Sequence, residues 1–94
     1  MKIHKQGSIA ILMRICGSQF KPCYYKEQKK AKALEVTEDI VLQKGIRYIV
    51  EQDAVTDENG MAEAVLVNIG NYIVITERGA RCLSSKEFYD MYSF

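Results

Sequence analysis

The first run of apolar residues spans positions 8–16 and is apolar on both of its alternating faces. Such a run is typical of a buried strand, although its length also fits a short helix. Gly17, Ser18 and Pro22 then interrupt the pattern, and a lysine-rich segment occupies positions 21–32. This segment is predicted to be either a solvated loop or the first turns of an exposed helix.

Apolar residues return after position 32, and here two patterns compete. Three short strands are predicted, at positions 33–36, 39–42 and 46–50. Apolar residues in the same stretch also have helical spacing, with Thr37 as a candidate cap. We favour strands joined by a tight turn at positions 43–45, because Gly45 would weaken a helix and β-branched and aromatic residues surround it.

Turn residues and short apolar runs alternate through the second half of the chain. Asn59 and Gly60 lie between apolar runs and tolerate positive φ, which predicts a hairpin there. Further strands are predicted at positions 62–67, 72–76 and 80–83, with turns at 68–71 and 77–79.

The last predicted element is a short amphipathic helix. Serine and glutamate side chains at positions 84–87 can cap its first turn, and Phe88, Met91 and Tyr92 follow at i, i+3 and i+4. Together the elements predict one α+β domain over residues 1–94, a small antiparallel β-sheet meander or partly open barrel with a short C-terminal helix. Most predicted turns are short, so strands adjacent in sequence are expected to be adjacent in the sheet.

Composition supports a folded domain in the cytoplasm. The chain is 48% hydrophobic and 27% charged, which is ordinary globular usage. Its apolar runs are too short for a secretory signal or a membrane span, so a cytoplasmic location and no membrane partner are expected. A domain of this size buries only about 60 to 65% of its unfolded surface, so a homo-oligomer is expected as well.

The net charge of +1 conceals an uneven distribution along the chain. Residues 1–32 carry eight basic side chains and one acidic one, a balance of +7, whereas residues 33–94 have a balance of −6. If the fold preserves this asymmetry, the basic part will attract phosphates or acidic surfaces, and two copies of the chain can attract each other.

The lysine-rich segment supplies most of the candidate ligand-binding residues. Lysines provide point charges for phosphates, and tyrosine rings can stack on bases. The candidates are Tyr24, Tyr25, Lys26, Lys29, Lys30, Lys32, Arg78 and Arg81. The alternative is a solvated loop whose lysines protect a sheet edge.

Residues for catalysis or metal binding lack the required pattern. His4, Cys16, Cys23 and Cys82 have no paired zinc-site spacing, and cysteines in predicted strands are expected to be reduced core thiols. Lysines near Cys23 could activate its thiol, but the one histidine, His4, lies on a terminus expected to fray. We therefore expect no catalytic residue, no metal and no cofactor.

The tail NIGNYIVITERGARCLSSKEFYDMYSF, residues 68–94, follows a pattern of turns and strands. It resembles the ending of small bacteriophage and prophage proteins of unknown function, which share a Gly-Asp-aromatic turn, two strands around a glycine turn, and a Phe-x-x-x-Tyr close. The matching features here are Gly70-Asn71-Tyr72, residues 73–76, Gly79, residues 80–83, and Phe88 with Tyr92. The usual aspartate is Asn71 and the usual preceding proline is Ile69.

The resemblance implies a phage or prophage origin, and its fixed residues are architectural rather than catalytic. The first functional hypothesis is therefore a non-enzymatic accessory protein that binds a host protein or a nucleotide-like small molecule in the host cytoplasm, with anti-defence activity as one form. The alternative is a small nucleic-acid-binding module using residues 21–32. A thiol enzyme at Cys23 ranks third.

Overall fold

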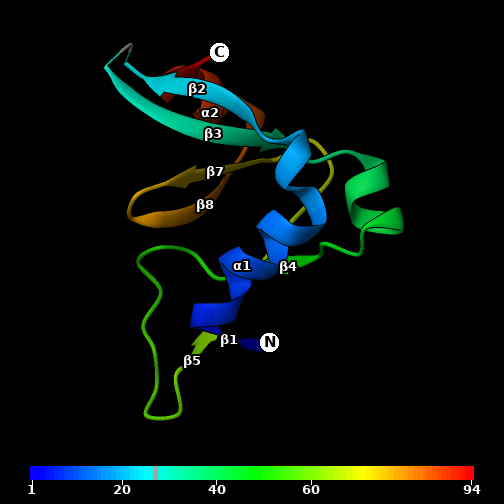
Figure 1. The fold of residues 1–94 in the computed structure, drawn as a ribbon, viewed down its shortest axis with the longest axis vertical. Coiled ribbons are helices and arrows are strands. Elements are labelled where there is room, and N and C mark those ends of the chain that lie inside the picture. The colour runs from blue at the N-terminus through cyan, green and yellow to red at the C-terminus, as the bar shows by residue number, and fades with distance from the viewer. Residues whose placement is uncertain (27) are drawn as a thin grey trace.

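The computed structural model describes residues 1–26 and 28–94 and confirms an α+β fold built on antiparallel sheets (Figure 1). The main sheet has five strands in the order β8-β7-β3-β2-β9. These strands are β2 (Lys21–Tyr25), β3 (Lys29–Glu35), β7 (Tyr72–Thr76), β8 (Gly79–Leu83) and β9 (Tyr92–Ser93). Because β8 and β9 are its two edges, the sheet does not close into a barrel.

Two small sheets and two α-helices complete the fold. In the first sheet β1 (Lys2–His4) pairs with β5 (Met61–Glu63), and in the second β4 (Tyr48–Ile49) pairs with β6 (Val65–Leu66). The helices are α1 (Lys5–Cys16) and α2 (Ser85–Met91), with shorter helical turns at Gly17–Gln19 and Asp39–Gln43.

The prediction of a strand at positions 8–16 is wrong, because these residues belong to helix α1. Leu12 and Cys16 are buried on one side of the helix, whereas Ile11 is 46% exposed. Leu12 and Cys16 pack with Leu34 and Ile73 of the main sheet. Packing against an apolar sheet face thus decides the conformation of a segment whose own pattern fits both helix and strand.

The prediction of a loop or helix for positions 21–32 is also wrong, because Lys21–Tyr25 form β2 and the residues from Lys29 onwards belong to β3; position 27 lies outside the described residues. Cys23 and Ala31 lie opposite each other in register and are both buried, while the lysines between them are exposed. This alternation has a period of two, but its apolar positions are occupied by small side chains. The lysines are consequently held in a hairpin rather than in a solvated loop.

The middle segment follows the helical alternative rather than the favoured strand. Residues Asp39–Gln43 form one π-helical turn with Ile40 buried, and the Ile40 amide donates to Thr37 Oγ1 at 3.4 Å. Gly45, with φ +75°, follows this turn, and only Tyr48–Ile49 of the strand predicted at 46–50 is extended in a sheet. The strand predicted at 62–67 is divided into β5 and β6.

Predictions for the C-terminal third are confirmed, with one correction. β7 has the predicted bounds, and β8 begins one residue early at Gly79. In the capping box of α2, Ser84 Oγ accepts from the Glu87 amide at 3.1 Å and Glu87 Oε1 accepts from the Ser84 amide at 3.0 Å. Tyr92, however, lies beyond the helix and pairs with Tyr25 of β2.

Sequence neighbours pair in the β2–β3 and β7–β8 hairpins, as expected, but not elsewhere in the main sheet. β3 pairs with β7, so Glu35 lies opposite Tyr72, and β2 pairs with β9. Each face of this sheet is covered by a helix. The α1 face carries Leu34, Ile73 and Ala80, and the α2 face carries Ala33, Val74 and Leu83 under Phe88.

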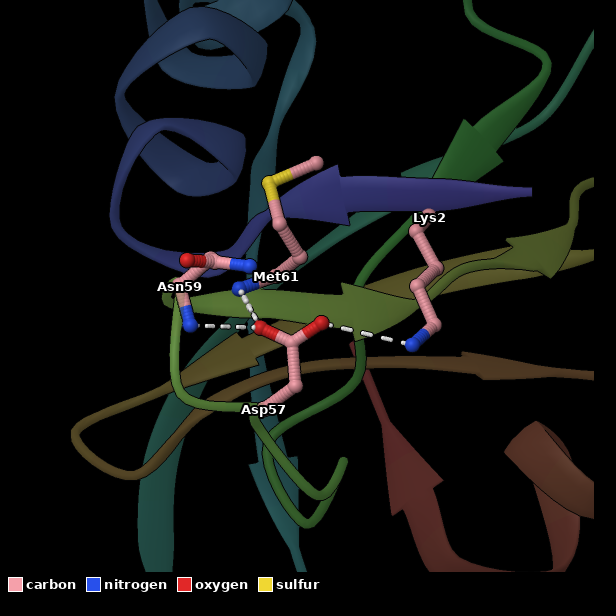
Figure 2. A network of polar contacts seen from close by, with 4 residues as sticks. All are labelled: Lys2, Asp57, Asn59 and Met61. Atoms are coloured by element: carbon pink, nitrogen blue, oxygen red, sulfur yellow. Dashed lines mark hydrogen bonds and ion pairs between the residues drawn. The ribbon is translucent and has the colours of Figure 1, made fainter.

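The predicted hairpin at Asn59 and Gly60 is confirmed, and the Asp57 carboxylate holds its turn (Figure 2). Asp57 Oδ1 accepts from the amides of Asn59 at 2.9 Å and Met61 at 3.0 Å, and Oδ2 accepts from Lys2 Nζ at 3.3 Å. Gly60 has φ +78°. Because Lys2 belongs to β1, this network also joins the N-terminal strand to the hairpin, and the N-terminal segment is paired rather than frayed.

Replacing Asp57 with asparagine is expected to reduce the loss of stability in acid. Several contacts hold the pKa of Asp57 below its usual range, and the hydrogen bond from the Met61 backbone amide contributes most. A carboxyl group whose pKa is lowered in the folded state stabilises it above the unfolded value of about 4, and this stabilisation disappears as the pH falls through the folded pKa. Urea denaturation from neutral pH downwards should therefore give a shallower decline for Asp57→Asn than for the wild type.

A matched control for this measurement is Glu58→Gln, at the next position of the same turn. Within the described part of the chain, the Glu58 carboxylate takes part in no hydrogen bond or ion pair, so its removal should leave the pH dependence unchanged. Equal declines for Asp57→Asn and the wild type would contradict the role assigned to the Asp57 network.

Candidate ligand-binding cleft

A cleft of about 540 Å³ lies where the β2–β3 and β7–β8 hairpins meet the end of α2. The strand register explains why the two hairpins are adjacent. Lys32 lies opposite Ile75 in antiparallel strands, so the beginning of β3 runs beside the end of β7. Both hairpins therefore have their turns at the same end of the sheet (Figure 1). Residues close to these turns line the cleft.

Four cationic residues line the cleft, and Glu77 lies among them. The cations are Lys29, Lys30, Arg78 and Arg81. The ion pairs found across residues 1–26 and 28–94 involve Met1 and Lys2, so none of the four cations forms an ion pair within that part of the chain. A concave site with this excess of positive charge attracts anions such as phosphate groups.

Tyr25, Met91 and Tyr92 provide an aromatic and thioether wall for the same cleft. Tyr25 and Tyr92 are opposite each other in β2 and β9, and their ring centroids are 5.4 Å apart at an interplanar angle of 60°. The Tyr92 ring also stacks on the buried Phe88 ring at 5.5 Å and 8°. Burial raises the pKa of the Tyr92 phenol, so its hydroxyl is a proton donor at neutral pH.

The arginines approach from the opposite side of this wall. Arg81 lies opposite Val74, which lies opposite Ala33, so Arg81 is on the α2 face of the sheet, as are Tyr25 and Tyr92. It comes from the edge strand β8, and the small residues Ala31 and Thr76 line the cleft from the strands between. A ligand in the cleft would therefore meet rings on one side and guanidinium groups on the other.

The structure brings together part of the predicted ligand-binding set. Tyr25, Lys29, Lys30, Arg78 and Arg81 line the cleft. Three other candidates do not. Two of them are Tyr24 and Lys32 on the α1 face, which Lys30 shares by register although it lines the cleft. The third is Lys26, which lies in the turn with φ +47° and Nζ 5.3 Å from the Tyr25 ring centroid.

The sequence interpretation missed the role of Met91 and Tyr92 in this cleft, because it assigned both to the packing face of the C-terminal helix. Gln52 and Thr76, which also line the cleft, were not candidates either. No local signal marks Tyr92 as a site residue. Its position depends on the pairing of β9 with β2, two segments that are far apart in the sequence.

A larger cleft of about 830 Å³ lies at the other end of the sheet, but its charges are balanced. Lys21 and Glu35 line it together with Tyr72, Tyr89 and other apolar or polar side chains. The hydroxyls of Tyr72 and Tyr89 are 2.9 Å apart, and Tyr72 Oη donates to Glu35 Oε1 at 3.4 Å. Because these polar groups contact one another and no net charge remains, we place the candidate site in the smaller, cationic cleft.

Two of the cysteines lie in the core, and the third, Cys82, is partly buried against it. Cys16, in a helix instead of the predicted strand, and Cys23 are buried, and burial raises the pKa of both thiols. Burial and the nearby Glu51 carboxylate raise the pKa of Cys82 to about 11. Thiols with raised pKa values stay protonated at neutral pH and are weak nucleophiles. Among the described residues, no three His, Cys, Asp or Glu side chains gather as metal ligands.

Comparisons of the chain with protein-family models, curated proteins and solved structures find no match. Neither α-helix of the described chain is long and apolar enough to cross a membrane. We therefore infer a function from the geometry and charge of the cationic cleft.

Proposed function

We propose that this chain is a non-enzymatic binding protein that captures a compact phosphorylated ligand in the cationic cleft. The observation that carries the proposal is the convergence of cations from two hairpins, Lys29 and Lys30 from one and Arg78 and Arg81 from the other. Arginine can bind phosphate oxygens through two parallel hydrogen bonds, and lysine adds a point charge. One phosphorylated molecule could satisfy donors from both hairpins at once.

A compact ligand fits this surface better than an extended nucleic acid does. Proteins that bind single strands offer a positively charged groove along which successive bases stack on aromatic side chains. Here both faces of the main sheet are covered by helices, and the basic residues of β3 divide between its two faces. The excess of cations nevertheless supports nucleic acid as the second candidate ligand.

The likeness of residues 68–94 to phage proteins supports a host component as the target of this binding. The ligand would then be a phosphorylated small molecule of the host cytoplasm, and the alternative target would be a host protein. Native mass spectrometry of the purified protein measures both its oligomeric state and any ligand that purifies with it. A ligand-free protein that binds no added phosphorylated molecule would contradict the proposal.

Replacing Arg78 with alanine is expected to weaken the binding of adenosine triphosphate (ATP) by about tenfold or more. Tenfold corresponds to about 1.4 kcal/mol, close to the contribution of one hydrogen bond to a charged group. Isothermal titration calorimetry at low salt measures the dissociation constants. The matched control is Lys32→Ala, which removes a cation from the same strand as Lys29 but from its α1 face, and which should leave the affinity unchanged.

Two results would separate the candidates or reject both. Equal losses for Arg78→Ala and Lys32→Ala would show that general charge, rather than the cleft, determines binding. A short single-stranded oligonucleotide that binds more tightly than ATP, with an affinity that increases with length and falls steeply with salt, would favour the nucleic-acid candidate.

A further inference from the structure

We infer that the ligand is a nucleoside phosphate and that Tyr25, Met91 and Tyr92 form a subsite for its planar base. This inference rests on the proposed function and specifies the chemical class of the ligand. It assigns two separate roles within the cationic cleft: the arginines and lysines hold the phosphates, and the aromatic wall holds the ring.

The register places the two subsites side by side. Tyr25 lies directly opposite Lys29 in β3 and directly opposite Tyr92 in β9, so these three residues form one row across the α2 face. Residues opposite each other in an antiparallel pair have Cβ atoms about 5 Å apart. A group bound at Lys29 is therefore adjacent to the tyrosine wall, and one molecule can contact both.

The rings of the wall are held in place before any ligand arrives. Tyr92 is fixed by stacking on Phe88, whose other stacking contact is Tyr72, at 4.3 Å and 7°. Tyr25 is fixed against Tyr92 by their edge contact. A ring that binds to a preorganised aromatic surface loses less free energy to the ordering of side chains.

The chemistry of the surrounding groups favours a planar base over an aliphatic chain. The Met91 thioether makes favourable contacts with aromatic rings, and arginine guanidinium groups such as that of Arg81 stack on planar π systems. The cleft volume of about 540 Å³ lies within the usual range for small-molecule sites, about 300–1,000 Å³. A nucleoside phosphate supplies the ring and the anion in one molecule of this size class.

Three probes test the assignment in titrations with the complete chain. Adenosine carries the ring alone, tripolyphosphate carries the phosphates alone, and ATP carries both. ATP should bind the wild type at least about tenfold more tightly than tripolyphosphate, as expected for stacking of one base on an aromatic side chain. Adenosine should bind more weakly than ATP.

Tyr92→Leu should remove the advantage of ATP over tripolyphosphate without changing the affinity for tripolyphosphate. The unchanged tripolyphosphate affinity shows at the same time that the variant is folded. Tyr25→Leu provides a second variant of the wall with the same expectation. Tyr24→Leu is the matched control, because Tyr24 is the neighbouring residue of β2 on the α1 face and should not affect either ligand.

The inference and the proposed function fail in different ways. If tripolyphosphate and ATP bind the wild type equally well, the base subsite is wrong while phosphate capture stands. If Tyr24→Leu lowers the ATP affinity as much as Tyr92→Leu does, the base lies elsewhere. If neither tripolyphosphate nor ATP binds, both the inference and the proposed function are rejected.

Discussion

Replacing Phe88 with alanine is expected to lower the free energy of unfolding by about 3–5 kcal/mol, the usual range for truncating a buried aromatic side chain. Phe88 is fully buried, and through it α2 packs against Cys23, Ala33 and Val74 of the main sheet. The substitution removes the apolar contacts of the ring and leaves a cavity between the helix and the sheet. It also removes the surface on which Tyr92 stacks.

Equilibrium urea denaturation measures this loss, with Val55→Ala as the control. Val55 is 87% exposed, so its truncation should change the stability by less than about 0.5 kcal/mol. Because a small domain has a total stability of only about 5–15 kcal/mol, Phe88→Leu extends the series with a smaller cavity. The expected order of stability is wild type, Phe88→Leu and Phe88→Ala. A Phe88→Ala variant as stable as Val55→Ala would contradict the packing described here.

The C-terminal elements were predictable because their local signals agree with their tertiary contacts. The β-branched run at Tyr72–Thr76 forms an interior strand of the main sheet, between β8 and β3, and the last helix begins at a capping box that the sequence already displays. Phe88 is a core residue, as its helical spacing indicates. At these positions the chain needs no distant segment to select its conformation.

The N-terminal third was not predictable in the same way. Most of residues 8–16 are apolar, so the spacing of their apolar positions does not distinguish a helix from a strand. In the lysine-rich segment and directly after it, the alternating core positions hold Cys23, Ala31 and Ala33, whose small side chains give a weak apolar signal next to five lysines. Pairing with β7, which lies far along the chain, is what makes β3 a central strand.

For the candidate site, too, the sequence indicates the residue types, whereas only the topology of the sheet brings them together. Charge and residue type identified Lys29, Lys30, Arg78 and Arg81 as candidates before their positions were known. Their convergence depends on the β3–β7 pairing, and the aromatic wall depends on the β2–β9 pairing. Because both pairings join segments that are distant in sequence, a one-dimensional pattern identifies the groups but not the cleft.

Gly79→Ala is expected to lower the free energy of unfolding by about 2–5 kcal/mol, because it combines two separate costs. Gly79 has φ +135°, and backbone strain of this kind costs a residue with a side chain about 1–3 kcal/mol. A Cβ atom at this position would also lie 2.9 Å from Gln52 Cβ and 3.1 Å from Gln52 Cα, and overpacking of this kind costs about 1–3 kcal/mol. The Gln52 backbone amide donates a hydrogen bond to Ala80 O at 2.8 Å. Gln52 therefore cannot move away without weakening this bond to β8.

Gly45→Ala is the control, because it introduces a side chain at a positive φ without a steric contact. Gly45 also has a positive φ, +75°, but a Cβ atom there would meet no other atom within 4 Å. Its replacement should therefore lower the free energy of unfolding only by the cost of backbone strain, about 1–2 kcal/mol. In urea denaturation the loss for Gly79→Ala should exceed the loss for Gly45→Ala, because the Gln52 contact and the less favourable φ both act at Gly79. Equal losses would contradict the close approach of Gln52 to the β7–β8 hairpin. Since Gln52 and Arg78 line the same cleft, Gly79→Ala should also weaken ATP binding, whereas Gly45→Ala should not.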